Sequence, residues 1–208
     1  MTGIQALERI APTKPMRARQ VERREFEYER HGTLSLIANF DVVSGQVVSP
    51  SLGPTRTEED FAVHIGRTID LDGEGVWLFL CDQLNTHQSE SLVRLVAERC
   101  GVKDELGEKG KSGVLKSMAT RAAFLSDPAH RIQFVYLPKH TSWLNQVEMW
   151  FSILQGQSLS GASFTDIKQL QEHIDAFIAA YNEDAEPFAW KKKKVHQRRF
   201  KGRRITQL

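Results

Sequence analysis

The sequence predicts an α/β protein in which helices flank a mixed sheet. Three observations support this fold class: a near-continuous apolar run at Val76–Cys81, a hairpin pattern over residues 34–49, and amphipathic helical patterns that alternate with strands. Hydrophobic residues make up 40% and charged residues 26% of the 208 residues, so most of the chain should fold. We expect one domain over residues 1–190, with an excursion at 101–129, followed by a basic tail at 191–208.

Cysteine usage and hydropathy exclude several classes of protein. Cys81 lies in an apolar run and Cys100 at a predicted helix end, so they form neither a disulfide framework nor a zinc cluster. No apolar run approaches the ~20 residues that a membrane span needs. The first ten residues lack the basic and apolar regions of a signal peptide. We therefore expect a cytoplasmic protein with no membrane partner.

The carboxyl-terminal tail is strongly cationic. Residues 191–204 contain nine Lys or Arg and no acid, while the whole chain carries a net charge of +2, so the rest of the chain is net acidic. A dense basic tail can bind phosphate backbones by counterion release without reading sequence. A solvated, disordered end is an equally good interpretation of the charge run.

The first elements are predicted from alternation and turn residues. Ile4–Arg9 is preceded by neither a capped helix start nor a complete alternating strand. Residues 21–29 fit either a strand exposed on one face or a charged loop. Leu34–Val43 and Gln46–Ser49 are predicted to form a hairpin around Ser44-Gly45.

The middle of the chain predicts a helix, a buried strand and a second helix. Thr57 can cap a helix over Glu58–Thr68, which has acids in its first turn. Val76–Cys81 is expected to be a strand buried on both faces. It ends at Asp82, where α/β sheets usually place their ligands. A helix from Ser89 or Glu90 to Cys100 follows, stopped by Gly101.

The second half predicts a return to the sheet and two more helices. Lys103–Lys116 is charged, has three glycines and is expected to leave the core. A helix at 117–125 and a strand at Arg131–Leu137 come next. Ser163-x-x-Asp166 resembles a capping box at the start of a long helix that ends near Asn182.

The stretch between that strand and the last helix predicts an amphipathic helix from about Ser142 to Gln155. Its apolar face consists of Trp143, Leu144, Val147, Trp150, Phe151 and Leu154. Its polar stripe consists of Asn145, Glu148, Ser152 and Gln155. An ordinary helix with a solvated glutamate is the alternative that this periodicity alone favours.

Two carboxylates, Asp82 and Glu148, come from elements that a compact α/β core can bring together. Carboxylates are oxygen ligands that gather Mg²⁺ or Mn²⁺. Paired ions about 4 Å apart can activate a water or a 3′-hydroxyl and stabilise the leaving oxygen of a phosphodiester. The segment GEKGKSG lacks the strand-to-helix context of a phosphate-binding loop.

Several stretches carry a resemblance to a known family. YLPKHTSWLNQVEMWFSIL closely resembles the third carboxylate motif of DDE transposases, in the insertion-sequence branch of the mariner superfamily. LFLCDQLNTH resembles their second motif, and residues 4–48 resemble the segment that follows their first. YNEDAEPFAW resembles their closing segment, so the resemblance covers nearly the whole chain.

The resemblance implies an RNase H-like fold and metal-dependent cleavage and strand transfer at transposon ends. Asp82 matches the second acid of the triad and Glu148 the third, with two Mg²⁺ or Mn²⁺ ions in an intact site. The place of the first acid falls just before Met1, so we expect the first core strand to be missing. Asp41 and Glu8 are weak substitutes for that acid.

The resemblance also bears on partners. It implies DNA as substrate, a homo-oligomer in the active complex, an upstream transposase fragment and association with the nucleoid. The expected DNA contacts are Lys139, His140, Lys191, Lys192, Lys193, Lys194, Arg198 and Arg199. The helix-turn-helix modules that read terminal repeats are absent from the sequence. His87 is expected either to orient a metal ligand or substrate phosphate, or to cap a helix or lie exposed.

Three points qualify the resemblance. Asp82 and Glu148 are further apart than is usual in mariner-type enzymes, and residues 101–129 account for the excess. A non-catalytic DNA-binding or dimerising remnant is an alternative function, because the triad is incomplete. A general RNase H-like nuclease is a second alternative.

Overall fold

The computed structural model describes residues 1, 3–11, 16, 18, 27–138 and 144–189. The strands are β1 (Ile4–Arg9), β2 (Tyr28–Phe40), β3 (Val47–Gly53), β4 (Trp77–Cys81) and β5 (Ile132–Tyr136). The helices are α1 (Glu58–Ile69), α2 (Glu90–Arg99), α3 (Met118–Leu125), α4 (Gln146–Leu154) and α5 (Ile167–Glu183). Short 3-10 turns lie at Asp70–Asp72, Asn85–Gln88 and Val114–Lys116, and a π-helical turn follows α4 at Gln155–Leu159.

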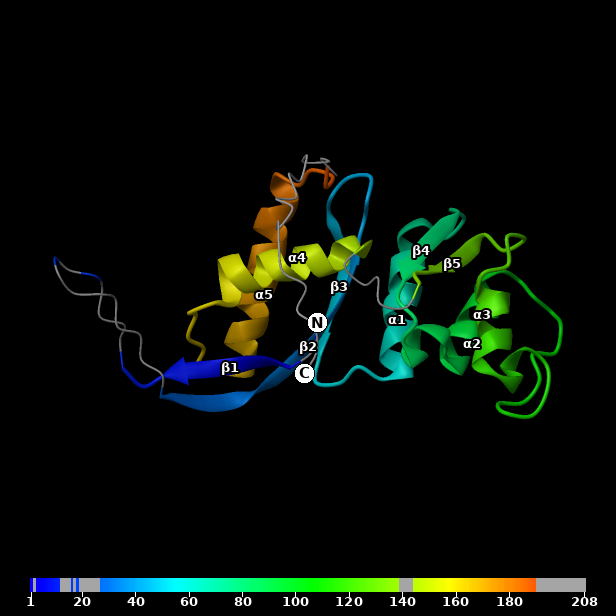
Figure 1. Ribbon diagram of the computed structural model, residues 1–208, viewed down its shortest axis with the longest axis horizontal. Coiled ribbons are helices and arrows are strands. Elements are labelled where there is room, and N and C mark those ends of the chain that lie inside the picture. The colour runs from blue at the N-terminus through cyan, green and yellow to red at the C-terminus, as the bar shows by residue number, and fades with distance from the viewer. Residues whose placement is uncertain (2, 12–15, 17, 19–26, 139–143, 190–208) are drawn as a thin grey trace, which may run out of the picture.

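The strands form two separate sheets, so the single mixed sheet is only partly observed. β1, β2 and β3 form an antiparallel sheet in that order, and β4 pairs with β5 in parallel. In Figure 1 the antiparallel sheet lies with α4 and α5, while β4 and β5 lie with α1, α2 and α3. The predicted α/β class, with helices flanking the sheets, is confirmed.

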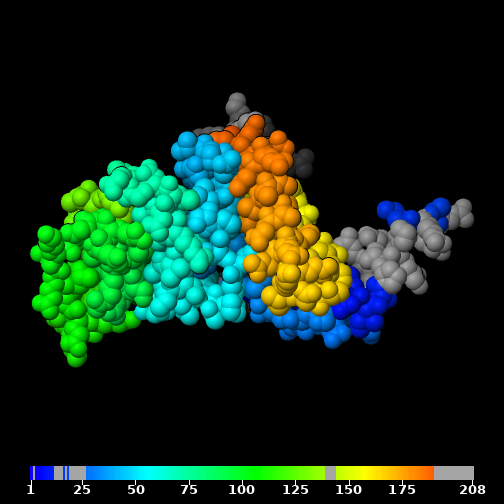
Figure 2. Space-filling view, turned by 180° about the vertical axis from the view of Figure 1, so that it is seen from behind, coloured from blue at the N-terminus to red at the C-terminus, as the bar shows by residue number. Residues whose placement is uncertain are grey.

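Each sheet has its own hydrophobic core. The first core lies under β4 and β5 and includes Phe61, Ile65, Phe79, Leu92, Val96, Leu115, Leu125, Ile132 and Phe134. The second lies between the antiparallel sheet and α4 and α5, and includes Ile4, Leu36, Val47, Trp150, Leu154, Leu170 and Ile174. From behind, α1 and β3 occupy the middle of the molecule, between the α2–α3 region and α5 (Figure 2).

The prediction that residues 76–81 are buried on both faces is wrong for this structure. Phe79 and Cys81 are buried in the first core, whereas Leu78 is 57% and Leu80 48% exposed. The reason is that α1 and α2 pack against the face that carries Phe79 and Cys81, whereas no described element buries the face that carries Leu78 and Leu80. The apolar run therefore forms a strand whose second face, with Leu78 and Leu80, is apolar but half exposed.

The helix that carries Glu148 begins later than the periodicity predicts. Its first residue is Gln146, because the Asn145 side chain caps it by accepting a hydrogen bond from the Val147 amide. Asn145 therefore caps the helix and does not belong to its polar stripe. Trp150 and Leu154 are fully buried, as the apolar face predicts. Ser142 and Trp143 lie outside the described residues.

The predicted start of the last helix also needs correction. Asp166 is the cap, and its Oδ1 accepts a hydrogen bond from the Gln169 amide at 2.8 Å. Ser163 instead accepts from the Arg9 amide at 2.9 Å and ties this turn to the end of β1. At α1 the predicted cap is confirmed, since Thr57 and Asp60 form a reciprocal capping box.

Two further segments differ from expectation in extent. The predicted hairpin forms, but its first strand reaches back to Tyr28 and its second runs on to Gly53. The segment 103–116 is mostly exposed, but Leu115 near its end is fully buried in the first core. Its charged residues lie on the surface around this apolar anchor.

The outer edge of β3 is closed by a side chain from the end of α5. The Asn182 carboxamide accepts from the Val47 amide and donates to the Val47 carbonyl, both at 2.9 Å. This pair of bonds imitates one step of a neighbouring strand. Phe188 stacks on Phe40 beyond it, with ring centroids 4.8 Å apart. The closing segment of the chain thus fastens to the antiparallel sheet.

Both cysteines are free thiols, with Cys81 buried and Cys100 partly exposed. Among the helices of the described residues, none combines the length and hydropathy required to cross a membrane.

The buried His64 predicts a loss of stability in mild acid. Its side chain is 0% exposed, with Nδ1 at 2.9 Å from the Ser51 hydroxyl, and burial lowers its pKa from 6.5 to about 4. The unfolded state therefore binds a proton more readily as the pH falls from 6.5 towards 4, so the folded state loses stability over that window. We expect a loss of about 2 kcal/mol between pH 7.5 and pH 5, measured by urea unfolding.

The matched variant is His64→Gln, which keeps a polar group near Ser51 but does not titrate. It should lose the part of the pH dependence between pH 6.5 and 5. An unchanged pH dependence in this variant would contradict the assignment to His64.

Candidate functional site

Asp82 and Glu148 line one cavity, although Asp82 follows β4 of the parallel sheet and Glu148 lies on α4, which packs against the antiparallel sheet. The cavity has a volume of about 120 Å³ and is also lined by Arg56, His87 and Met1. Asp82 follows the last residue of β4, and Glu148 lies in the first turn of α4. The geometry therefore brings together the two carboxylates that the sequence singled out.

Asp82 is held in place by hydrogen bonds on one side of its carboxylate. Its Oδ1 lies 2.7 Å from Nδ1 of His87 and accepts a bond from the Leu84 amide at 3.2 Å. The hydrogen bond from His87 is the main reason why the pKa of Asp82 lies below its usual value, with partial burial acting in the opposite direction. Asp82 is therefore ionised at neutral pH and keeps its other oxygen free of these bonds.

His87 is itself positioned by the first core. Its ring packs on Phe61 with centroids 4.3 Å apart, and its backbone carbonyl accepts a hydrogen bond from the Tyr136 hydroxyl at 2.8 Å. Its backbone amide bonds to the Leu84 carbonyl at 3.0 Å within the turn after β4. Of the two roles expected for His87, the structure favours orienting Asp82.

Glu148 is positioned by the second core. Trp150 and Leu154, on the opposite side of α4, are fully buried there, which fixes the rotation of the helix about its axis. The place of Glu148 in the first turn is favourable for a negative charge, because the free amides of the helix end lie nearby. Its carboxylate therefore projects from a helix end that the fold holds rigidly.

The Met1 amino group and the Arg56 side chain lie close to the carboxylates. The Met1 amino group donates to the Leu36 carbonyl at 2.7 Å, and burial lowers the pKa of this amine to about 6 despite the attraction of Glu148. The charge of Arg56 contributes to the low pKa of Asp82. Arg56 was not predicted from the sequence, since a single arginine before a helix cap has no distinguishing pattern.

The donor set of this cavity suits a divalent cation that prefers oxygen. Asp82 and Glu148 offer carboxylate oxygens, and such ions complete their coordination with water or substrate phosphates. Burial raises the pKa of the neighbouring Cys81 thiol to about 12, so it stays protonated and is no thiolate ligand. The residues therefore fit Mg²⁺ or Mn²⁺ better than a thiophilic metal.

The weak substitutes for a third acid lie elsewhere. Asp41 accepts hydrogen bonds from Ser44 and Val43 in the hairpin turn, and the Ser44 hydroxyl is the main cause of its lowered pKa. Glu8 lies beside His31 at 2.7 Å. Glu8, Glu29 and His31 form the one group of three side chains with metal-ligating atoms within 4.8 Å of one another among the described residues. Neither Asp41 nor Glu8 lines the cavity of Asp82 and Glu148.

The expected DNA contacts cannot be placed. Lys139, His140 and the tail residues Lys191, Lys192, Lys193, Lys194, Arg198 and Arg199 lie outside the described residues. Their roles stay predictions from the sequence.

The fold and the cavity define a class of protein: an RNase H-like α/β domain with acids at the end of a sheet strand and on a following helix. Residues 5–171 match the family described as DDE superfamily endonuclease, and the chain belongs to this family. The expected relation to DDE transposases is confirmed at that level. No curated protein and no solved structure matches the chain.

The paired carboxylates predict a measurable cation site. Asp82→Asn and Glu148→Gln should each weaken Mn²⁺ binding at least about tenfold, because each removes one anionic oxygen ligand while conserving shape. Isothermal titration with Mn²⁺, without DNA, measures this directly.

Asp41→Asn is the matched control, since the Asp41 carboxylate accepts a hydrogen bond from Ser44 within the hairpin turn and does not line the cavity of Asp82 and Glu148. It should bind Mn²⁺ as the unmodified chain does. Equal affinities in all three variants would show that Mn²⁺ binds elsewhere.

Proposed function

We propose that this chain is the catalytic portion of a DDE transposase, which cleaves DNA strands and transfers them with the help of divalent cations. The observation that carries the proposal is the single cavity that holds Asp82 and Glu148, in a chain of the DDE superfamily endonuclease family. That family membership supports DNA as the substrate. Mg²⁺ or Mn²⁺, two ions in an intact site, is the proposed cofactor.

Asp82 and Glu148 would hold the cation, and His87 would keep Asp82 in position. The bound cation would supply Lewis-acid stabilisation of the charge on the attacking and leaving oxygens. In cleavage, a water oxygen forms a bond to phosphorus and gives up a proton to solvent, while the P–O3′ bond breaks and the leaving 3′-oxygen takes up a proton to become a 3′-hydroxyl. In strand transfer, the freed 3′-hydroxyl attacks a target phosphodiester, and another 3′-oxygen leaves with a proton.

Finer aspects of the proposal come from the resemblance. They are an origin in the insertion-sequence branch of the mariner superfamily, a homo-oligomeric active complex, an upstream transposase fragment as partner, and action on DNA in the cytoplasm or nucleoid. We propose residues 1–190 as the catalytic domain and residues 191–208 as a DNA-binding tail.

The proposed cleavage is tested by nicking of supercoiled plasmid DNA. We expect open-circle product with Mg²⁺ or Mn²⁺ and none with excess EDTA. Asp82→Asn and Glu148→Gln should each lower the nicking rate at least about 100-fold. Mutating a residue that only hydrogen-bonds to a metal ligand already costs about 10- to 100-fold in activity, and these variants remove the ligand itself. Asp41→Asn should leave the rate unchanged.

Other outcomes favour other functions. DNA binding without any cation-dependent nicking would contradict the proposal and favour a non-catalytic remnant. Cleavage of RNA–DNA hybrids in preference to plasmid DNA would favour a general RNase H-like nuclease.

The basic tail predicts affinity that depends on salt but not on sequence. Replacing Lys191, Lys192, Lys193 and Lys194 by alanine should weaken binding to every duplex tested. The negative slope of log K against log salt should become shallower by up to about 3.6, because four fewer lysines release counterions from the DNA. Fluorescence anisotropy over a salt series measures this slope.

Lys168→Ala is the control, because Lys168 is an exposed lysine on α5 outside the tail. It should leave the slope unchanged. An unaltered slope in the tail variant would show that the tail does not contact the DNA backbone.

A further inference from the structure

A second group of metal-ligating side chains lies on the antiparallel sheet. Glu8 lies on β1 and Glu29 and His31 lie on β2, with one ligating atom of each within 4.8 Å of the other two. We call these three side chains the strand cluster. In Figure 1 the end of β1 that carries Glu8 points away from β4 and β5. The strand cluster therefore lies at the far end of its sheet from the strand that leads to Asp82.

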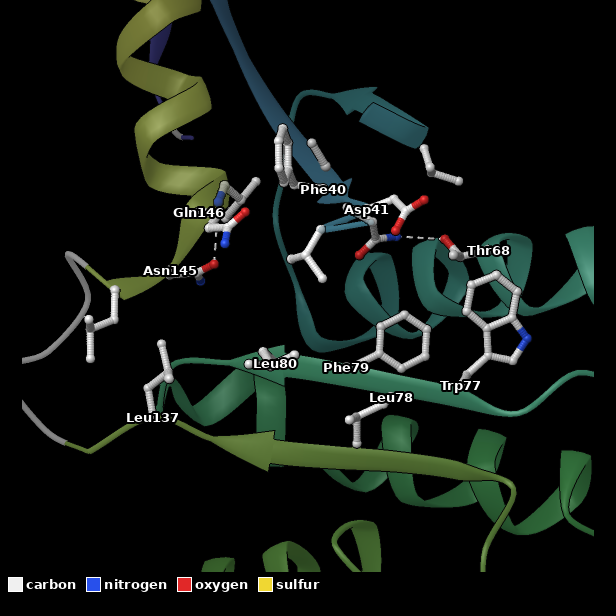
Figure 3. Close-up of a pocket in the computed structure, with 16 residues that line it drawn as sticks. Phe40, Asp41, Thr68, Trp77, Leu78, Phe79, Leu80, Leu137, Asn145 and Gln146 are labelled. Atoms are coloured by element: carbon white, nitrogen blue, oxygen red, sulfur yellow. Dashed lines mark hydrogen bonds between the residues drawn. The ribbon is translucent and has the colours of Figure 1, made fainter. Parts of the chain in front are cut away.

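The strand cluster is separate from both cavities beside β4. The cavity of about 310 Å³ shown in Figure 3 lies between β2 and β4 and has Asp41 as its one acidic lining residue. The cavity of about 120 Å³ contains Asp82 and Glu148. No member of the strand cluster lines either cavity. A cation held by the strand cluster is thus at a different site from the one proposed for DNA cleavage.

A β-bulge in β2 brings the three side chains to one face of the sheet. Continued pairing from Ala6 would set Arg30 opposite Glu8. The register instead shifts by one residue after Ala6, so that Glu8 pairs with Glu29. Residues directly opposite each other in an antiparallel pair share a face. The bulge therefore turns Glu29 to the face of Glu8, and His31 is the extra residue beside them.

The bulge is held in place by the start of α5. Gly32, next to the bulge, has a φ of +128°, which favours glycine. A Cβ at this position would lie 2.9 Å from Ile167 Cδ1, so the strand approaches α5 too closely for a side chain. On β1, the Leu7 carbonyl accepts a hydrogen bond from the Phe164 amide at 2.8 Å. Both strands that carry the strand cluster are therefore fixed to the same neighbouring segment.

The bulge creates a pair of like charges. Glutamates directly opposite each other on paired strands repel and destabilise the sheet. Within the part of the chain that the structure describes, no lysine or arginine forms an ion pair with Glu8 or Glu29, and the ion-pair partner of Glu8 is His31. The two carboxylates share at most one positive charge, so the strand cluster is net negative. A bound cation would remove the repulsion that the bulge introduces.

The donor set favours zinc among the divalent cations. Histidine nitrogens and carboxylate oxygens bind Zn²⁺ at about 2.0 to 2.2 Å, and a tetrahedral arrangement then places donors about 3.3 Å apart. The strand cluster fits this spacing, with His31 Nε2 at 2.7 Å from Glu8 Oε2 and all three ligating atoms within 4.8 Å. An imidazole ligand suits Zn²⁺, whereas Mg²⁺ prefers oxygen. Glu29 is exposed, which leaves room for water as the fourth ligand.

We propose that Glu8, Glu29 and His31 bind one Zn²⁺ ion, which clamps β1 to β2 where their pairing ends. Arg9 with Tyr28 is the last pair of the two strands and follows directly after Glu8 with Glu29. The ion stabilises the folded chain, because these ligands come together only when the bulge has formed. This structural role does not depend on the proposed nuclease function.

Isothermal titration of the full chain with Zn²⁺, in excess Mg²⁺ and without DNA, measures this binding. Glu29→Gln removes one anionic ligand at an exposed position and should weaken Zn²⁺ binding at least about tenfold. Glu59→Gln, at an exposed position in the first turn of α1, is the matched control and should bind Zn²⁺ as the unmodified chain does. Asp82→Asn should also retain this binding, because Asp82 lines a different site.

Thermal unfolding gives a second readout. Without metal, Glu29→Gln should melt no lower than the unmodified chain, because the substitution removes a like-charge pair. Zn²⁺ should raise the melting temperature of the unmodified chain and of Glu59→Gln, but not that of Glu29→Gln. An equal response to Zn²⁺ in the two glutamine variants, or loss of Zn²⁺ binding in Asp82→Asn alone, would overturn the proposal. Neither result would bear on the nuclease function, which plasmid nicking tests separately.

Discussion

The candidate site depends on the packing of two separate hydrophobic cores. Asp82 directly follows a strand anchored in the first core by Phe79, and Glu148 lies in the first turn of a helix anchored in the second core by Trp150. Neither core by itself fixes the distance between the carboxylates. That distance follows from how the cores meet, through contacts such as the 2.6 Å hydrogen bond from the Asn39 carboxamide to the Thr68 hydroxyl. Anything that joins the two sheets more firmly should also order the site.

Periodicity predicted the elements well and their surroundings less well. The buried face of α4 follows from the spacing of Trp150 and Leu154, because the helical period is an intrinsic property of the backbone. The start of that helix does not follow, since capping by Asn145 depends on local hydrogen bonding that a hydrophobic pattern does not encode. The exposure of Leu78 could not be foreseen either. An apolar run indicates that its side chains favour burial, but it does not indicate whether a neighbouring helix or strand covers each face.

The site was predictable in part. Asp82 follows a strand and Glu148 lies on an amphipathic helix, and both elements can be predicted from hydrophobic periodicity. The resemblance of the surrounding motifs to those of DDE transposases then indicated that these two acids bind metal. The contact between His87 and Asp82 was one of two options, because proximity in sequence cannot distinguish a ring turned towards a carboxylate from one turned to solvent. Arg56 was missed because its position depends on tertiary packing. The cluster of Glu8 with Glu29 and His31 likewise needs the register of β1 against β2.

The central claim is that Asp82 and Glu148 form one cation site in the folded chain. Anomalous scattering from crystals soaked in Mn²⁺ tests it most directly, because it places the ion without reference to activity. We predict an anomalous peak within coordination distance, about 2 to 2.5 Å, of carboxylate oxygens of both residues. A peak only at the cluster of Glu8, Glu29 and His31, or none near Asp82, would contradict it.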